Sequence, residues 1–285
     1  MPFVTGRTRV IAHLGVPTDS FRAPMIYNPW FAACGANAIV VPMGVEAADF
    51  ATFLPLVARM RNFAGALVTM PHKVAVVALL DEASPAVRAC GAANAVRREA
   101  DGRLVGDMFD GEGFVRGMRR GGRDPRGQSA LVVGAGGVGP AIAASLAAAG
   151  LAHLVLHDAR AESADRLAAR LARAFPALRI SIGAPDPAGH DIAVNATPLG
   201  MKEDDPLPFD PERLAPHALV GEVVLSRRET PLVAAARNRG HAVQVGTDML
   251  FEQIPAYLEF FGLPVASAEE LRRLAPEPPA GGDAG

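Results

Sequence analysis

Cysteine is scarce in this sequence, with only Cys34 and Cys90 among 285 residues. The two lie far apart, and neither belongs to a CxxC pair or has a cluster of histidines nearby. Disulfide scaffolds need several cysteines, and zinc sites need ligands at short, characteristic spacings. The sequence therefore signals neither a disulfide framework nor a metal site, and it fits a protein of the reducing cytoplasm.

An excess of charge and long apolar runs are also missing. The 28 basic and 30 acidic residues leave a formal net charge of -2, too little to attract nucleic acid or an anionic membrane strongly. No stretch of about 18 apolar residues is uninterrupted, and residues 1–9 contain no apolar signal segment. We therefore expect a soluble, unexported protein without a nucleic-acid or membrane partner.

A large apolar fraction is present, and it alternates between two periodicities. Half of the residues are apolar, enough to build cores for two domains of ordinary size. The first half predicts strands and helices in turn, with strands over 9–15, 38–42 and 66–69 and helices over 25–34, 48–58 and 73–80. The second half predicts strands over 130–133 and 153–157, helices over 140–149 and 162–174, and strands near Arg179, Ile192, Val220 and Ala242. Such alternation implies a parallel or mixed sheet.

The segment between the halves has the composition of a domain junction. Residues 121–128 are rich in glycine, proline and aspartate and show no periodicity, so we place the first domain boundary there. The last ten residues, 276–285, consist of Pro, Gly, Ala and acidic residues, and we expect them to be disordered.

A GxGxxG loop lies between the strand at 130–133 and the helix at 140–149. Its glycines allow a tight turn and a close approach to a pyrophosphate, whose charge the helix N-terminus stabilises. Glycine turns also occur for packing alone, but here the strand, the helix and a later acid have the spacing of a dinucleotide fingerprint. The sequence predicts a dinucleotide site that includes Gly134, Gly136, Gly137, Val138 and Gly139.

The later acid, Asp158, bears on the choice of dinucleotide. Just past the second strand of the unit, it is placed to bind the adenosine ribose hydroxyls and to repel a 2'-phosphate, which favours NAD over NADP. A solvated turn acid is the plainer interpretation. Arg160, two residues later in the chain, would instead favour NADP, because a guanidinium binds the 2'-phosphate well.

Two ionisable residues precede the junction. The run 66–69 breaks at Pro71 and is followed by Lys73, and Asp110 lies among glycines ahead of a predicted helix. Taken alone, Lys73 is more typical of a surface lysine and Asp110 of a helix cap. If the two side chains meet between the domains, they form a pair able to move a proton to or from a substrate hydroxyl.

Several motifs in a fixed order resemble the shikimate and quinate dehydrogenases. The resemblance covers nearly the whole chain and is carried by Gly15-x-Pro17 to Pro24, Val68-Thr69-x-Pro71-His72-Lys73, Gly91-Ala92-Ala93-Asn94, Asp110-Gly111-x-Gly113, the glycine loop, Asn195 to Met201, Thr230-Pro231-Leu232, and Gly246 with Met249-Leu250 and Gln253. It implies an α/β fold with two domains. These are an N-terminal α/β substrate domain over 1–122, completed by a C-terminal helix within 247–275, and a Rossmann-type doubly wound dinucleotide-binding domain over 123–246.

The resemblance also implies roles for residues of the substrate site. Lys73 and Asp110 match the family's catalytic pair. Asn94 and Gln253 match residues that bind substrate hydroxyls. Thr69 matches a threonine that offers its hydroxyl to substrate, although a β-branched residue at a strand end is equally ordinary.

Further matches concern the cofactor. Asn195, Thr197 and Gly246 match positions that line the cofactor groove, although an Asn-Ala-Thr-Pro turn also needs such side chains for its own hydrogen bonds. His72 lies beside the lysine but points the opposite way along an extended backbone, so we assign it a structural role.

The sequence departs from the family at the end that binds the substrate carboxylate. Phe21 and Ala23 stand where shikimate enzymes have two serines, and their loss weakens carboxylate binding by about 2–6 kcal/mol unless another donor compensates. Arg22 is the first candidate for that donor, with Ser20 as the second, and a solvated surface arginine is the alternative for Arg22.

Other departures make the same site more apolar. Leu67 replaces an asparagine, Ala95 a threonine, and Met108-Phe109 an Asn-Thr pair ahead of the aspartate. We therefore expect that shikimate itself is not the preferred substrate.

Together these features predict a dehydrogenase that transfers a hydride between NAD, in preference to NADP, and a cyclic secondary alcohol or its ketone. The substrate would be shikimate, quinate or a less acidic ring polyol, and the protein a monomer or homodimer. Two alternatives stay open: an enzyme like the methylenetetrahydrofolate dehydrogenases, and a non-catalytic nucleotide-responsive sensor. The Lys-Asp spacing and the motif at 195–201 disfavour the first, and a sensor has no need of a proton shuttle.

Overall fold

The computed structural model describes residues 4–227 and 229–275. Within these residues no helix is both long enough and apolar enough to cross a bilayer. The predicted disordered tail, 276–285, lies outside the described residues.

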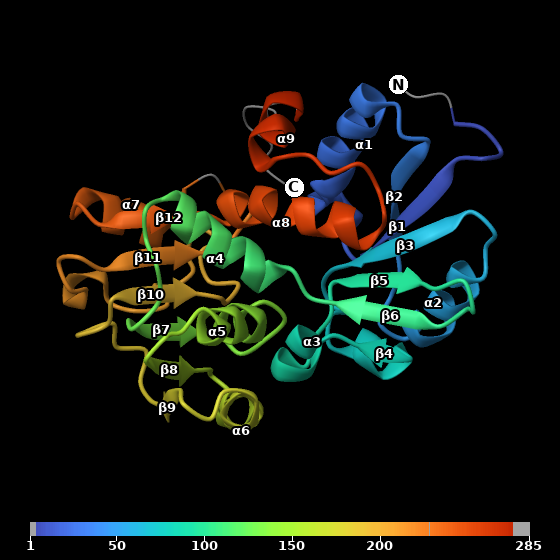
Figure 1. Cartoon of the computed structure of the whole chain (residues 1–285). Helices are drawn as coiled ribbons and strands as arrows, with labels where there is room; N and C mark the ends of the chain where they lie inside the picture. The colour runs from blue at the N-terminus through green and yellow to red at the C-terminus, as the bar shows by residue number, and fades with distance from the viewer. Residues whose placement is uncertain (1–3, 228, 276–285) are drawn as a thin grey trace.

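The first half of the chain builds one six-stranded sheet (Figure 1). Its elements in chain order are β1 (Arg9–Gly15), η1 (Thr18–Ser20), α1 (Ala23–Cys34), β2 (Ala38–Gly44), α2 (Phe50–Ala58), β3 (Phe63–Val68), η2 (Ala75–Leu79), β4 (Glu82–Ala83), α3 (Pro85–Cys90), β5 (Ala95–Arg98), β6 (Leu104–Asp107) and α4 (Asp110–Arg120). The strand order is β2-β1-β3-β5-β6-β4, and β5 runs antiparallel to both neighbours. Every residue of β3 is buried, as expected for a central strand covered on both faces.

The second half builds a second six-stranded sheet, in which all the pairings are parallel. Its elements are β7 (Ser129–Val133), α5 (Gly139–Ala148), β8 (His153–His157), α6 (Ala161–Ala174), β9 (Arg179–Ile182), β10 (Ile192–Asn195), η3 (Pro211–Arg213), β11 (Leu219–Glu222), α7 (Pro231–Asn238) and β12 (Ala242–Gln244). The order β12-β11-β10-β7-β8-β9 is that of a doubly wound dinucleotide-binding sheet. The glycine loop follows β7, at the point where the strand order reverses.

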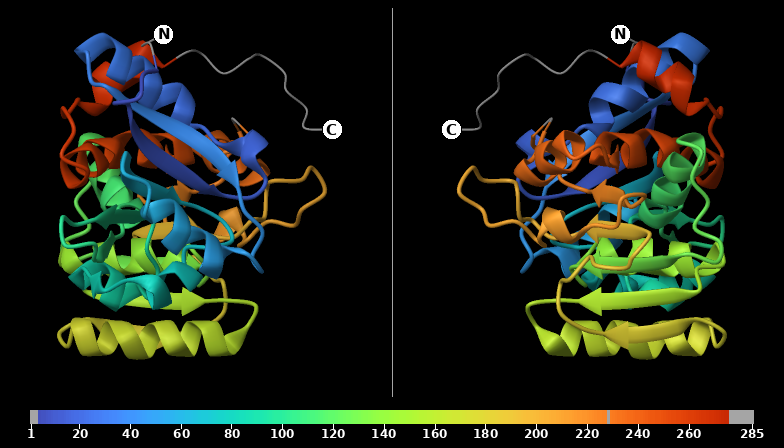
Figure 2. Two further views of the ribbon diagram at one scale, coloured as in Figure 1. Left: turned by 90° about the vertical axis from the view of Figure 1, so that its right-hand side faces the viewer. Right: turned by 90° about the vertical axis from the view of Figure 1, so that its left-hand side faces the viewer.

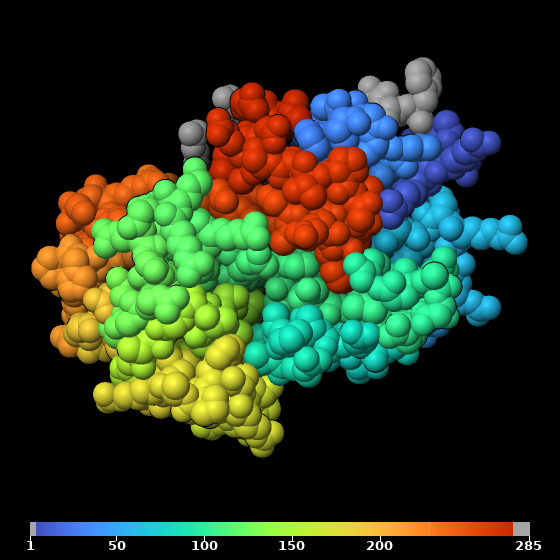
Figure 3. Space-filling view, viewed as in Figure 1, coloured from blue at the N-terminus to red at the C-terminus, as the bar shows by residue number. Residues whose placement is uncertain are grey.

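Two helices join the halves. The chain enters the second half through α4 and returns through α8 (Gly246–Phe260), which precedes α9 (Ala268–Leu274). Figure 1 shows α4 and α8 beside each other between the two sheets, and Figure 3 shows the residues of α8 and α9 in surface contact with the N-terminal residues. In the side views of Figure 2, α6 and β9 form the opposite edge of the molecule.

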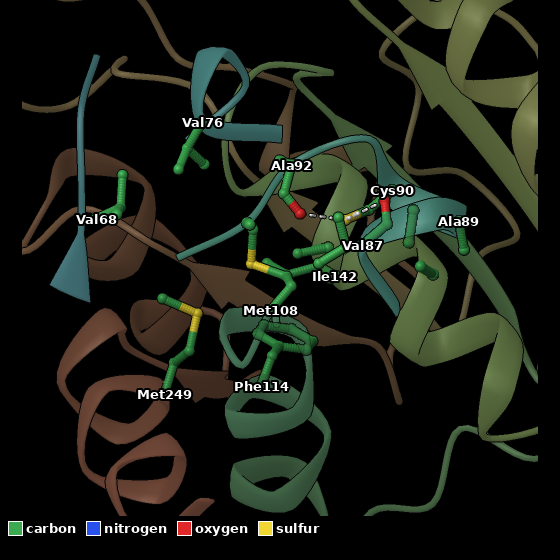
Figure 4. Packing of buried hydrophobic residues seen from close by; sticks show 14 of the residues in the cluster. Val68, Val76, Val87, Ala89, Cys90, Ala92, Met108, Phe114, Ile142 and Met249 are labelled. Atoms are coloured by element: carbon green, nitrogen blue, oxygen red, sulfur yellow. Dashed lines mark hydrogen bonds between the residues drawn. The ribbon is translucent and has the colours of Figure 1, made fainter. Parts of the chain in front are cut away.

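Glycines on α4 allow its neighbours to come close. A Cβ on Gly111 would lie 2.0 Å from the Ala141 carbonyl oxygen on α5, and one on Gly113 would lie 2.5 Å from the Met249 carbonyl oxygen on α8. Such distances exclude any side chain, so α4 is held between α5 and α8 by backbone contact. Figure 4 shows the apolar side chains that fill the adjoining core, among them Met108, Phe114, Ile142 and Met249.

The α/β fold with two sheets is confirmed, but one predicted helix is wrong. Residues 73–80 form only the 3-10 helix η2. This segment is rich in β-branched valines, which lower helix propensity, and its end is fixed where Asp81 N donates to the Leu104 carbonyl at 2.8 Å. The predicted boundary near 121–128 falls between α4 and β7, and the exact domain limits stay a prediction.

Candidate active site

Lys73 and Asp110 form a buried ion pair. The Lys73 Nζ donates to Asp110 Oδ2 at 2.5 Å, and their side chains are 11% and 4% exposed. Asp110 is the first residue of α4, where the positive end of the helix dipole favours a carboxylate. The Lys73 carbonyl accepts from Ala93 N at 2.8 Å, which fixes the lysine backbone against the segment that leads into β5. The structure thus brings the two predicted catalytic residues together.

Asn94 lies at the centre of this arrangement. Its Oδ1 accepts from Phe109 N at 3.0 Å, and its carbonyl accepts from Val68 N at 2.8 Å. The residue is 1% exposed, and its Nδ2 has no hydrogen-bond partner among the described residues. A buried amide donor without a partner is costly unless a ligand or a water accepts from it. Asn94 therefore has the geometry expected of a residue that binds a substrate hydroxyl.

Gln253 approaches the same place from α8. Its side chain is buried, and its Oε1 has no partner among the residues described. The absence of a side chain on Gly113 admits it, because a Cβ there would lie 2.8 Å from the Gln253 Cβ. One turn further along, Tyr257 donates its hydroxyl to the Asn94 carbonyl at 3.4 Å, and burial raises the tyrosine pKa well above its ordinary value. α8 thus supplies both a substrate-binding candidate and a contact that holds Asn94.

The segment that departs from the family borders this group. Phe21 follows η1, and a Cβ on Gly15 would lie 3.1 Å from the tip of the Phe21 ring and 2.4 Å from the Thr69 Cγ2. Phe21, Gly15 and Thr69 are therefore neighbours. Ala23 is buried at the start of α1, while Arg22 is half-buried and its guanidinium makes no hydrogen bond or ion pair with the described residues.

His13, which was not among the residues predicted from the sequence, lies against Phe21. It lies on β1, 8% exposed, with its ring stacked on Phe21 at a centroid distance of 4.0 Å. Burial and, secondarily, the positive charge of Lys73 lower the pKa of His13 to about 3. The sequence carried one signal, since a histidine interrupts an otherwise apolar run. His72 takes the structural role expected of it, stacking on Phe50 and hydrogen-bonding the Val45 carbonyl at 2.7 Å.

The glycine loop combines closed and open positions. A Cβ on Gly139 would lie 1.9 Å from the Gly134 carbonyl oxygen, and Gly134 itself has φ +108°. Gly136 has no atom within 4 Å of its Cβ position, and a Cβ on Gly137 would lie 3.6 Å from the Lys73 Cδ. The turn therefore requires glycine at Gly134 and Gly139, whereas Gly136 and Gly137 leave open space, at Gly137 beside the lysine. A pyrophosphate fits such a loop, because backbone amides approach it without side chains between.

Asp158 hydrogen-bonds the backbone of the glycine loop. Its Oδ2 accepts from Ala135 N at 2.7 Å, and its Oδ1 accepts from Arg160 N at 2.8 Å. Both bonds orient the carboxylate at the carboxyl end of β8, beside the loop. The Arg160 side chain is 78% exposed and lies 3.9 Å from the carboxylate, so it is free to turn towards a ligand. Val138 precedes the first turn of α5.

Asn195 and Thr197 are engaged in a network of their own. The Asn195 Oδ1 accepts from the Thr197 hydroxyl at 2.6 Å, and its Nδ2 donates to the Glu222 carboxylate at 3.0 Å. Glu222 also accepts from the Thr230 hydroxyl at 2.9 Å, and burial raises the pKa of Glu222. These bonds fix the turn after β10. Gly246 has a packing reason too, because a Cβ there would lie 2.8 Å from the Val223 carbonyl oxygen.

Comparison with known proteins decides the family. Residues 14–96 match the family described as Shikimate dehydrogenase substrate binding domain. A shikimate dehydrogenase (NADP(+)) of Rubrobacter xylanophilus is 39% identical over 260 residues, which cover 89% of this chain and 90% of that protein. This chain belongs to the shikimate dehydrogenase family. It is therefore an NAD(P)-dependent oxidoreductase that acts on a CH-OH group, as the sequence predicted.

Two solved structures of known activity share the fold. The quinate dehydrogenase from Corynebacterium glutamicum, in complex with NAD, has a TM-score of 0.83 at 32% identity, covering 94% of this chain and 98% of that chain. The ligand-free 5-ketofructose reductase of Gluconobacter sp. strain CHM43 has a TM-score of 0.83 at 26% identity, covering 95% of this chain and 99% of that chain. In this chain the ion pair of Lys73 and Asp110 lies beside the glycine loop and next to the predicted substrate residue Asn94.

Proposed function

We propose that this dehydrogenase interconverts a cyclic secondary alcohol and its ketone, with Lys73 and Asp110 handling the hydroxyl proton. The observation that carries the proposal is the buried pair itself, 2.5 Å apart and beside Gly137 of the dinucleotide loop. The nicotinamide, when bound, accepts or delivers the hydride. In the direction of reduction the Lys73 ammonium donates a hydrogen bond and then a proton to the carbonyl oxygen. Asp110 orients the lysine throughout by accepting a hydrogen bond from its Nζ.

The unpartnered groups nearby would hold the rest of the ring. Asn94 offers an N–H donor, and Gln253 offers an acceptor oxygen. A hydroxyl satisfies either one, since it both donates and accepts. Two such contacts, one from the residue before β5 and one from α8, together with the Thr69 hydroxyl, fix the ring so that one carbon faces the dinucleotide.

The preferred substrate is proposed to lack a carboxylate. Phe21 and Ala23 provide no hydroxyl, and the Gluconobacter relative is named for 5-ketofructose, a sugar ketone without a carboxylate. Quinate is the second candidate, because the Corynebacterium relative is a quinate dehydrogenase and because the Arg22 side chain has no hydrogen-bond or ion-pair partner among the described residues. A guanidinium there would bind a carboxylate bidentately.

NAD is proposed as the preferred cofactor. The argument is electrostatic, because Asp158 presents a fixed negative charge at the carboxyl end of β8, where a 2'-phosphate would have to lie. The name of the Rubrobacter relative carries NADP, and Arg160 is the residue through which this chain would accept it.

An initial-rate panel tests the proposed function. NAD and NADP reduction is followed with shikimate, quinate and cyclohexanetriols, and oxidation of NADH and NADPH is followed with 5-ketofructose. Turnover of at least one of these compounds is expected, fastest for a compound without a carboxylate. Turnover restricted to shikimate or quinate would move the assignment to the carboxylate branch and to Arg22. Silence throughout, with nucleotide still bound, would contradict the proposal and favour a sensor.

A further inference from the structure

His13 is a polar residue in a strand that is otherwise built for the core. Its neighbours along β1, Ala12 and Leu14, are fully buried. In the sheet it lies between Pro42 of β2 and Leu67 of β3, neither of which offers its side chain a hydrogen bond. Its Nδ1 has no hydrogen-bond partner in 4–227 or 229–275. A buried polar atom without a partner calls for an explanation, which the fold itself does not provide.

The position of His13 connects it with the active site. Its ring stacks on Phe21, and the tip of the Phe21 ring lies beside Gly15 and Thr69. Lys73 is close enough for its charge to act on the imidazole. Phe21 thus links His13 to Gly15 and Thr69, in the segment that borders the predicted substrate residues.

The charge state of His13 limits what it binds. The pKa of His13, about 3, keeps the imidazole uncharged at neutral pH, because burial disfavours the charged ring and, secondarily, because Lys73 is positively charged. An uncharged imidazole has one N–H donor and one acceptor nitrogen. It suits a hydroxyl or a carbonyl, and it cannot neutralise a carboxylate that has been removed from water. Phe21, stacked against it, has no polar atom.

We propose that His13 and Phe21 together select a substrate without a carboxylate, His13 by hydrogen-bonding a substrate hydroxyl or carbonyl oxygen and Phe21 by occupying the space where a carboxylate would be bound. The inference rests on the proposed function and adds the residue that recognises the uncharged end of the ring. His13 is thus a specificity residue that acts together with Phe21. The two residues do different work, so they are tested by different substitutions.

His13→Phe and His13→Gln test the hydrogen bond. The first keeps an aromatic ring for stacking and removes both nitrogens, while the second retains a donor and an acceptor. The readout is kcat and KM for the carboxylate-free compound that the parent uses best, from the panel of cyclohexanetriols and 5-ketofructose. His13→Phe is expected to raise KM by about 5- to 50-fold with a smaller change in kcat, and His13→Gln to recover part of the loss. The melting temperature and the dissociation constant for NAD verify that the fold and cofactor site persist.

Phe21→Ser with Ala23→Ser tests the selection against carboxylates. The double variant is expected to raise kcat/KM for quinate relative to the uncharged compound by about 10-fold or more, because two hydroxyl donors replace an apolar wall. An unchanged ratio, together with an unchanged KM in His13→Phe, would overturn the inference while leaving the dehydrogenase assignment intact. A parent that prefers quinate over every uncharged compound would overturn it as well. Failure of the parent to oxidise or reduce anything in the panel would instead reject the proposed function on which it rests.

Discussion

Lys73 and Lys202 are the two lysines of this chain, and the remaining basic side chains are all arginine. Arginine stays protonated in proteins, whereas lysine exchanges its proton when its surroundings favour it. A lysine in a buried pair with a carboxylate, in a chain whose other basic residues are nearly all arginine, is what the proposed proton transfer by Lys73 requires. Lys202 is exposed and supplies a matched control for experiments on Lys73.

Asp158 gives a prediction for cofactor choice. Replacing it by Asn keeps the side-chain size and removes the charge that opposes a 2'-phosphate. We expect Asp158→Asn to lower the ratio of kcat/KM for NAD to that for NADP by about 10-fold, which corresponds to about 1.4 kcal/mol. The measurement is steady-state kinetics with each nucleotide at saturating alcohol substrate.

Asp165→Asn is the control for that experiment, because it removes a charge from α6 beyond the turn that contacts the loop. It should leave the ratio unchanged. An Asp158→Asn enzyme with the parent's ratio would show that the carboxylate acts only as a brace for Ala135 N and Arg160 N.

Among individual residues, those that belong to a local motif, such as the glycines of the dinucleotide loop, were predictable, whereas contacts between distant residues were not. The contact between Lys73 and Asp110 could not be predicted from local sequence, because 37 positions separate the two residues and only the fold determines their distance. His13 was missed for the same reason. Its proposed role depends on Phe21, which the chain brings back against the end of β1, and no periodicity predicts such a contact.

At the scale of elements, segments with clear apolar patterns were predicted closely, including the short strands of the second sheet, whereas β5 and β6 of the first sheet were not predicted. The strand at 9–15 coincides with β1, and the helix at 162–174 differs from α6 by one residue. β5 and β6 are four-residue strands that each contain only two large apolar or alanine residues beside polar or glycine residues, so their sequences carry little signal. The extent of η2 depends on the contact of Asp81 with β6, which lies outside the local sequence.

The α4 and α8 contact supplies a prediction at this scale. Gly113→Ala adds a methyl group 2.5 Å from the Met249 carbonyl oxygen and 2.8 Å from the Gln253 Cβ, so α8 has to move. We expect destabilisation by about 1–3 kcal/mol and a higher KM for the alcohol, since Gln253 moves with the helix. Denaturant unfolding and steady-state kinetics measure the two effects.

Gly6→Ala is the control, because nothing lies within 4 Å of its Cβ position and its φ is not in the left-handed region. It should change neither stability nor KM. A Gly113→Ala enzyme with the parent's stability would mean that α8 tolerates a shift, and the close contact would then have no role in holding Gln253.

For the whole molecule, two sheets are joined through α4 and α8 (Figure 1). The proposed substrate site therefore combines the segments that follow β3 and precede β5 with the first turn of α4 and the returning α8. The two-domain plan was predictable because each half has its own strand and helix pattern. The use of α8 by the first half was implied by the family resemblance alone, since no local feature shows which sheet a C-terminal helix covers.

The stability of the whole fold is expected to depend on pH through His13. Its pKa is depressed in the folded protein to about 3, whereas the unfolded chain titrates near 6.5. The unfolded state therefore binds the extra proton first, and the contribution is complete above pH 6.5 and is lost as the pH falls from there towards 3. Between pH 6.5 and 5.5 the parent should lose about 1 kcal/mol more than His13→Phe does.

Denaturant unfolding of the parent and of His13→Phe at several pH values measures the predicted difference in how the unfolding free energy depends on pH. Other titrating groups, such as the buried Glu222, are shared by both proteins and cancel in the comparison. Parallel stability curves for the two proteins below pH 6.5 would contradict a buried, uncharged imidazole.

The most direct test of the central claim is the turnover number of Lys73→Ala beside that of Lys202→Ala, measured with the best alcohol and nucleotide from the panel. The account predicts a fall in kcat of about 10²- to 10⁴-fold for Lys73→Ala, with nucleotide binding retained, and parental kcat for Lys202→Ala. A Lys73→Ala enzyme that turns over at the parental rate would contradict the assignment of the buried pair as the proton-transfer group.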